Sequence, residues 1–133
     1  MDRLARKHES ARSALPPPIV DSGSGAAVGL IAYGTTHHAV VEARDQLADK
    51  GLATDYLRVR ALPLSHSIAD FVAAHERVYV IEQNRDGQMY DLLRLELPAD
   101  VVGRLSSIRH YDGRPIPAEA ITRPLLELEA VPA

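Results

Sequence analysis

The chain has 133 residues, of which 46% are hydrophobic and 25% charged, which is enough for one globular domain and too few for two. Its formal net charge of −3 provides no broad positive surface, so we expect neither nucleic acid nor a membrane as a partner. Because it has no cysteine, the chain offers no disulfide, no thiolate nucleophile and no cysteine ligand for zinc or an iron–sulfur cluster.

No segment of the sequence resembles a membrane span or a secretory signal. The longest apolar run, residues 26–33, is far short of the roughly 20 residues that a helix needs to cross a bilayer. The first residues are charged and lack the apolar core of a signal peptide. We therefore expect a cytoplasmic protein.

Residues 1–27 have the composition of a linker. A charged segment, residues 1–15, is followed by three prolines and then by a stretch rich in serine and glycine, residues 21–25. Prolines favour an extended spacer and Ser/Gly alternation favours flexibility, a combination typical of a tether. The chain is therefore predicted to be one module of a larger assembly, or a fragment of one.

From residue 28 onward, strands and helices are predicted in alternation. Residues 28–33 are a continuous apolar run typical of a strand buried on both faces. A helix is predicted from Thr36 to Gly51, because apolar residues recur there at helical spacing and glycine supplies a stop. Residues 54–61 alternate in polarity, which predicts a strand near a sheet edge with one face in water.

The alternation continues in the second half of the chain. Ser65 or Ser67 caps a predicted helix, and residues 77–82, apolar on both faces, then predict a central strand. After a polar loop, a further helix is predicted to run from about residue 89 to Pro98, where proline ends it.

A weaker strand at residues 105–110 and a last helix, starting near Pro117, complete the predicted elements. Ile121, Leu125 and Leu128 align on one face of this helix, and Pro124 is a candidate break in it. The alternation predicts a single three-layer α/β/α domain with a mostly parallel sheet over residues 28–128. Residues 1–27 are the predicted linker and residues 129–133 a tail.

Two loops are expected at the same edge of this sheet. We assume that the strand at residues 28–33 lies between the strands at 54–61 and 77–82. The loops that follow the strands at 28–33 and 77–82 then emerge from the same edge of the sheet, on opposite sides of a topological switch point. The first loop contains Gly34, Thr35 and Thr36. Their backbone N–H groups and hydroxyls suit either an anion or ordinary capping of the helix that follows.

The second loop is the densest polar cluster of the chain. Three interpretations are open for it: pairing across a domain or subunit interface, which we favour, a plain surface loop, or contact with a ligand. As a catalytic site it lacks an evident nucleophile, metal ligand set or oriented histidine. The cluster consists of Glu82, Gln83, Asn84, Arg85, Asp86, Gly87 and Gln88.

The histidines favour structural roles over metal binding. His37 and His38 are adjacent in sequence, so both rings cannot readily face one metal ion from a helix. His75 is placed near a helix end, where it can interact with terminal carbonyls, whereas His66 and His110 have no obvious partners.

No residue is predicted to be catalytic, and no residue is predicted to bind a cofactor or a metal. Arg58 and Arg60, on one face of a predicted strand, suit either a carboxylate or phosphate ligand or simple exposure to solvent. Ser65 and Ser67 lack the G-x-S-x-G context of a nucleophilic serine.

From about Arg3 to Leu126 the sequence resembles the 2-oxoacid:ferredoxin oxidoreductases. It is most similar to the C-terminal domain of the alpha subunit of the 2-oxoglutarate type, a module related to the transketolase C-terminal domain. The segment around the Glu-Gln-Asn-Arg-Asp-Gly-Gln sequence is the most specific. The resemblance is carried by residues 31–36, 56–63, 75–88, 110–113 and 115–116.

The resemblance implies a complex that converts a 2-oxoacid and CoA to acyl-CoA and CO₂ while reducing ferredoxin. Thiamine diphosphate, Mg²⁺ and an iron–sulfur cluster are implied in the parent complex and none of them in this chain. The implied partners are the thiamine-binding alpha domain and the beta subunit, with ferredoxin and CoA met only through the complex. A natural short gene product, a truncated gene and an excised piece all remain open origins for the chain.

Two functions compete at this point. The leading hypothesis is a non-catalytic structural and subunit-interaction domain, with the two loops as contact positions. The alternative is a free-standing module that binds CoA, a flavin or another phosphate-bearing ligand in the switch-point crevice. An autonomous enzyme ranks third, and we do not expect the isolated chain to be active.

Overall fold

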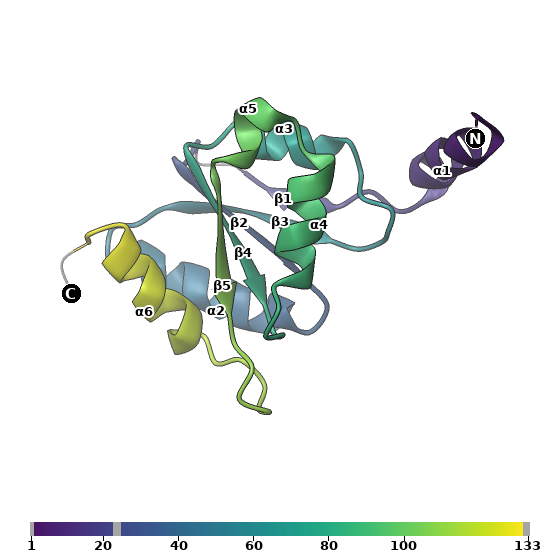
Figure 1. Cartoon of the computed structure of the whole chain (residues 1–133). Coiled ribbons are helices and arrows are strands. Elements are labelled where there is room, and N and C mark those ends of the chain that lie inside the picture. The colour runs from purple at the N-terminus through teal and green to yellow at the C-terminus, as the bar shows by residue number, and fades with distance from the viewer. Residues whose placement is uncertain (1, 23–24, 132–133) are drawn as a thin grey trace.

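The computed structural model describes residues 2–22 and 25–131 and contains one five-stranded sheet (Figure 1). The strands are β1 (Ile19–Asp21), β2 (Val28–Tyr33), β3 (Thr54–Val59), β4 (Arg77–Glu82) and β5 (Leu105–Arg109). The helices are α1 (Asp2–Ala14), α2 (Thr36–Asp49), α3 (Ser67–Ala73), α4 (Gln88–Glu96), α5 (Ala99–Val102) and α6 (Glu119–Leu128). None of the helices in these residues is long and apolar enough to cross a membrane.

The strand order is β1-β3-β2-β4-β5, and every neighbouring pair except β1 and β3 is parallel. Helices cover both faces of this sheet (Figure 1). Leu30 and Tyr79 pack on one face with α2 and α6, and Ile31 and Val80 pack on the other with α3, α4 and α5. This alternation along each strand makes both faces of the central strands apolar. The predicted three-layer α/β/α fold, its mostly parallel sheet and the assumed order of the first three strands are confirmed.

Strand β3 lies next to the edge strand, as predicted, but the prediction that one of its faces is in water is wrong. Residues 19–21 pair antiparallel with residues 56–58 and form the outer strand, and Tyr56 is only 4% exposed. Strand β1 escaped prediction because three residues are too few to show an alternating pattern. It lies within the segment predicted as a linker, as does α1, which extends away from the sheet in Figure 1.

Helix α6 differs from prediction in two respects. Pro124 lies inside it without ending it, and Leu128 is 60% exposed rather than packed inward. Glu129, in the segment predicted as a tail, takes the next inward position after Leu125, with a side chain only 4% exposed. A carboxylate is tolerated there because it has partners on β4.

The partners of Glu129 are Arg77 and Tyr79. Arg77 Nε lies 2.9 and 2.7 Å from the two carboxylate oxygens, and the Tyr79 hydroxyl donates to Oε2 at 2.6 Å. Burial alone would raise the pKa of Glu129, but the hydrogen bonds from Arg77 and Tyr79 and the charge of Arg77 outweigh it and hold this pKa below its usual range. The ionised carboxylate thus fastens the end of α6 to the start of β4.

The Glu129→Gln substitution should lower the free energy of unfolding by about 1–3 kcal/mol at pH 7, because two charge-assisted hydrogen bonds are lost. The folded-state pKa of Glu129 lies below that of the unfolded chain. Its stabilisation is therefore present above pH ~4.3 and disappears as the pH falls through the folded-state pKa. Urea denaturation from pH 7 to pH 3 measures this, with the exposed Glu127→Gln as control. Equal losses for the two variants at pH 7 would contradict the assignment.

Candidate functional site

The structure brings the two predicted loops together at the carboxyl edge of the sheet. The side-chain amide of Gln83, just after β4, donates to Thr36 Oγ1 at 3.1 Å and lies 3.4 Å from Thr35 Oγ1. The amide oxygen of Gln83 accepts the backbone N–H of Ile116 at 3.0 Å. One glutamine therefore joins the loop after β2, the loop after β4 and the segment that leads into α6.

Glu82 is the fully buried centre of this edge, with an exposed fraction of 0%. Its Oε1 accepts the backbone N–H of Met89 at 2.6 Å, and Oε2 accepts that of Tyr90 at 3.1 Å. These N–H groups belong to the first turn of α4, where helical N–H groups lack intrahelical acceptors and where the helix dipole favours negative charge. Glu82 thus caps a helix that begins six residues further along the chain.

Two side chains complete the surroundings of Glu82. The Tyr33 hydroxyl and the Asn84 amide donate to Oε1 at 3.2 and 3.0 Å. Burial, and then the charge and hydrogen bond of Glu82, raise the pKa of Tyr33. Tyr33 is therefore a neutral donor at pH 7. The Glu82 carboxylate accepts four hydrogen bonds in all, two from backbone N–H groups and two from side chains.

Asn84 closes the loop. Its Oδ1 accepts the backbone N–H groups of Gly87 and Gln88 at 2.7 and 3.2 Å, three and four residues further along the chain. Gly87 has φ of 64°, and a Cβ atom at this position would lie 3.3 Å from Arg109 Cδ. Glycine therefore suits this position both for its conformation and for the close approach of β5.

The predicted contact residues accordingly divide into two groups. Glu82, Thr36 and Gly87 are buried, while Gln83 and Asn84 are half-buried and hydrogen-bonded within the chain. The exposed members, which are available to another molecule, are Gly34, Thr35, Arg85, Asp86 and Gln88. Among these, Arg85 and Asp86 pair with each other at 3.0 Å.

Two hollows flank the junction between the loops. One, of about 320 Å³, lies on the α4 side and is largely apolar, with Leu62 at its rim 57% exposed. The other, of about 350 Å³, lies on the side of α2 and is lined by Thr35, Gln83 and Ile116 among others. The crevice expected between the loops is thus bridged by Gln83, leaving a hollow on either side.

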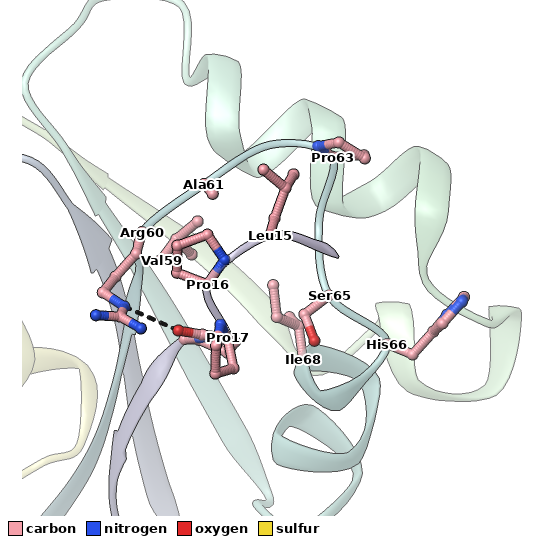
Figure 2. A pocket seen from close by; sticks show the side chains of 11 residues that line it. Leu15, Pro16, Pro17, Val59, Arg60, Ala61, Pro63, Ser65, His66 and Ile68 are labelled. Carbon is pink, nitrogen blue, oxygen red and sulfur yellow. Dashed lines mark hydrogen bonds between the residues drawn. The ribbon is translucent and has the colours of Figure 1, made fainter. Parts of the chain in front are cut away.

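A further hollow lies between the N-terminal segment and the connection from β3 to α3 (Figure 2). It has a volume of about 310 Å³, and residues 15–18 form one of its walls. Figure 2 shows Arg60 reaching across to this wall, where Nε donates to the Pro17 carbonyl at 2.9 Å. Arg60 is therefore exposed to solvent, which is one of the two roles considered for it, and it also binds the chain's own backbone.

His75 makes the predicted contact with a helical carbonyl and a second contact that was not predicted. Nδ1 donates to the Phe71 carbonyl at 2.6 Å, and Nε2 lies 2.7 Å from Asp55 Oδ2, with both residues at most 3% exposed. The contact with Asp55 was not predicted because Asp55 lies on β3, 20 residues before His75 in the sequence. A charged residue within an otherwise buried strand is the signal that could have identified it.

His37, His66 and His110 have separate partners and do not converge on one site. His37 Nδ1 contacts the Tyr56 hydroxyl at 3.1 Å, and His66 Nε2 contacts Glu9 at 2.9 Å. His110 Nε2 lies 3.0 Å from an Asp112 carboxylate oxygen without forming a hydrogen bond. In residues 2–22 and 25–131, no three His, Asp or Glu side chains are grouped as metal ligands.

Comparison with known proteins shows what this chain is similar to. No family model matches the sequence. The chain is 31% identical over 100 residues to the alpha subunit of 2-oxoacid:ferredoxin oxidoreductase 2 from Aeropyrum pernix. The chain is related to the alpha subunits of 2-oxoacid:ferredoxin oxidoreductases. The match covers 74% of the chain but only 15% of that relative.

Solved structures agree with this relationship. A 2-oxoglutarate:ferredoxin oxidoreductase from Magnetococcus marinus superimposes with a TM-score of 0.77 at 26% identity, covering 90% of this chain and 21% of that one. The resemblance to the alpha subunit of this family, stated above from the sequence, is confirmed. The chain spans only a small part of either relative.

Two more distant structures share the fold alone. The alpha chain of a probable 2-oxoacid ferredoxin oxidoreductase from Thermoplasma acidophilum has a TM-score of 0.53 at 14% identity, covering 84% of this chain and 96% of that one. A split-gene transketolase has a TM-score of 0.64 at 16% identity, covering 88% of this chain and 43% of that one. The transketolase C-terminal-like architecture predicted for the chain is confirmed.

Proposed function

We propose that this chain is a non-catalytic structural and subunit-interaction domain of a 2-oxoacid:ferredoxin oxidoreductase of the 2-oxoglutarate type. The observation that carries the proposal is that Glu82 is buried and hydrogen-bonded within the chain. The polar cluster most specific to the family contains one fully buried carboxylate, and its partners are backbone and side-chain donors of the same chain. Such a group organises a loop and is shielded from any substrate.

The contact surface that we propose is the exposed part of the two loops. Gly34 and Thr35 lie in one of these loops and Arg85, Asp86 and Gln88 in the other, and Gln83 joins the two loops through Thr35 and Thr36. The backbone of the second loop is held by Glu82 and Asn84. A fixed backbone lowers the entropy cost of association. The partners would be the thiamine-binding alpha domain and the beta subunit.

The complex as a whole would convert a 2-oxoacid and CoA to acyl-CoA and CO₂, with the two electrons passed to ferredoxin. The Magnetococcus marinus structure carries 2-oxoglutarate, coenzyme A and succinyl-CoA, which supports 2-oxoglutarate as the substrate class. Thiamine diphosphate, Mg²⁺ and an iron–sulfur cluster would be held by other parts of the complex. This chain has no cysteine for an iron–sulfur cluster, and its described residues contain no group of three His, Asp or Glu side chains that could hold a metal ion.

The proposal is tested by mixing the purified chain with the remaining part of an alpha subunit and the beta subunit. We expect a stable complex at micromolar concentration by size-exclusion chromatography. Failure to associate would overturn the proposal.

The alternative function, a small-ligand module, draws support from the two hollows beside the loops, whose volumes fall at the lower end of the range for ligand sites. A ligand at 100 times its dissociation constant would stabilise the isolated chain by about 2.7 kcal/mol. A thermal shift with CoA or a flavin would favour this alternative, and its absence would favour the interaction domain.

A further inference from the structure

A groove on the α2 side of the sheet lies away from the two loops. It has a volume of about 660 Å³, and its floor is formed by the side chains of β3 that face α2, among them Tyr56 and Arg58. Residues of helix α2 form one wall and residues of the edge strand β1 the other. The lining includes Ile19 and Val41, which are 49% and 44% exposed.

The middle of this groove is electrically neutral. Arg44 Nη1 donates to Asp21 Oδ2 at 2.9 Å, and Nη2 donates to the Thr54 carbonyl at 2.7 Å. Arg44 Nε also donates to Thr54 Oγ1 at 3.2 Å. The guanidinium group of Arg44 is therefore occupied by β1 and β3 and is not available to a ligand.

Arg58 differs from Arg44. It is half-buried, and its guanidinium nitrogens make no hydrogen bond or ion pair with the residues described in the structure. Tyr56 and His37 lie at the same end of the groove, with rings stacked at 5.7 Å and a 3.1 Å contact between the Tyr56 hydroxyl and His37 Nδ1. A guanidinium beside stacked aromatic rings and exposed aliphatic side chains has the composition of an interaction hot spot.

The charge at this end comes from Arg58. Burial raises the pKa of Tyr56 to about 12, so its hydroxyl is neutral at pH 7. Burial, and then the positive charges of Arg58 and His38, lower the pKa of His37. The other charged groups that line the groove are the paired Asp21 and Arg44, and Asp45. A ligand with a single negative charge is thus favoured near Arg58, whereas a ligand with several negative charges would be repelled by the Asp45 carboxylate.

We propose that this groove docks a partner polypeptide that presents a carboxylate beside a large apolar side chain. The carboxylate would pair with Arg58, for which a two-pronged guanidinium–carboxylate contact is the strongest available geometry. The apolar side chain would cover Ile19 and Val41. This inference rests on the proposed function, because the partner would be a subunit of the same oxidoreductase, and it adds a second contact surface remote from the loops.

The test compares Arg58→Glu and Arg58→Gln with a charge-reversal control, Arg94→Glu, in the full chain. Arg94 is exposed on α4, on the other face of the sheet. Binding to the beta subunit together with an alpha subunit that lacks this domain is measured by calorimetry, after thermal unfolding has shown that all variants are folded. We expect Arg58→Glu to weaken binding at least about tenfold, Arg58→Gln to weaken it less, and Arg94→Glu to leave it unchanged.

The outcomes separate the two proposals. If the wild-type chain binds and Arg58→Glu binds equally well, the groove is not a docking surface, although the proposed function stands. If the wild-type chain does not bind at all, both proposals fail. If the chain alone forms dimers that Arg58→Glu abolishes, a second copy occupies the groove, and the proposed partner is wrong.

Discussion

Replacing Glu82 with alanine should lower the free energy of unfolding by about 3–5 kcal/mol, because it removes a buried carboxylate and leaves its donors without an acceptor. Two backbone N–H groups at the start of α4, the Tyr33 hydroxyl and the Asn84 amide all point at a carboxylate with no exposed surface. Water cannot replace it without opening the core, so these buried donors would be unsatisfied.

The conservative variant Glu82→Gln should lose nearly as much stability. Its amide has the same shape, but one of its two terminal atoms becomes a donor facing a backbone N–H of Met89 or Tyr90. Urea denaturation followed by circular dichroism measures both variants, with the exposed Glu127→Ala as control. A loss below about 1 kcal/mol for Glu82→Ala, the range of an ordinary surface substitution, would contradict the role given to this carboxylate.

The second large effect concerns the buried pair of Asp55 and His75. Asp55→Leu or His75→Phe alone should cost about 3–5 kcal/mol, because each leaves a polar partner buried without its counterpart. The double variant should lose less than either single one, since a buried polar pair can be replaced by apolar side chains at little net cost. A double-mutant cycle measures this coupling directly. Additive losses would show that the 2.7 Å contact carries no energy of its own.

The His75 ring also packs against a second aromatic ring. It packs against Phe71 at a centroid distance of 4.4 Å, and both rings cover Gly29 on β2, where a Cβ atom would lie 2.8 Å from Phe71 Cε1. Phenylalanine at position 75 is larger than imidazole and can overpack this site. Methionine at position 75, which is flexible, is therefore the second variant for the cycle.

The architecture could be predicted because the strands that matter are apolar on both faces. The runs at residues 28–33 and 77–82 have the pattern of buried parallel strands, and the helices between them carry an apolar stripe. Strand β1 could not be predicted, since its three residues gain their structure only by pairing with β3. The inward turn of Glu129 likewise depends on Arg77 and Tyr79, which are distant in sequence.

The candidate site was located by its polarity, but its internal roles were not predictable. A cluster of polar residues after a buried strand indicates that partners are needed, and it does not say whether they lie inside or outside the chain. The acceptors and donors around Glu82 include the backbone N–H groups of Met89 and Tyr90, which carry no sequence signature. Nothing in the sequence distinguishes Arg58 from Arg60. They differ because the Arg60 side chain donates to the Pro17 carbonyl, whereas the Arg58 guanidinium has no such partner in the described residues.

The central claim is that the chain contributes contacts, and no chemistry, to a larger oxidoreductase. The most direct measurement is 2-oxoglutarate- and CoA-dependent reduction of ferredoxin by the reconstituted alpha and beta subunits, with the alpha subunit lacking this domain and the chain added separately. We predict no turnover by the chain alone and restored turnover when it is added to the other parts. Turnover by the isolated chain, or full activity of the complex without it, would contradict the account.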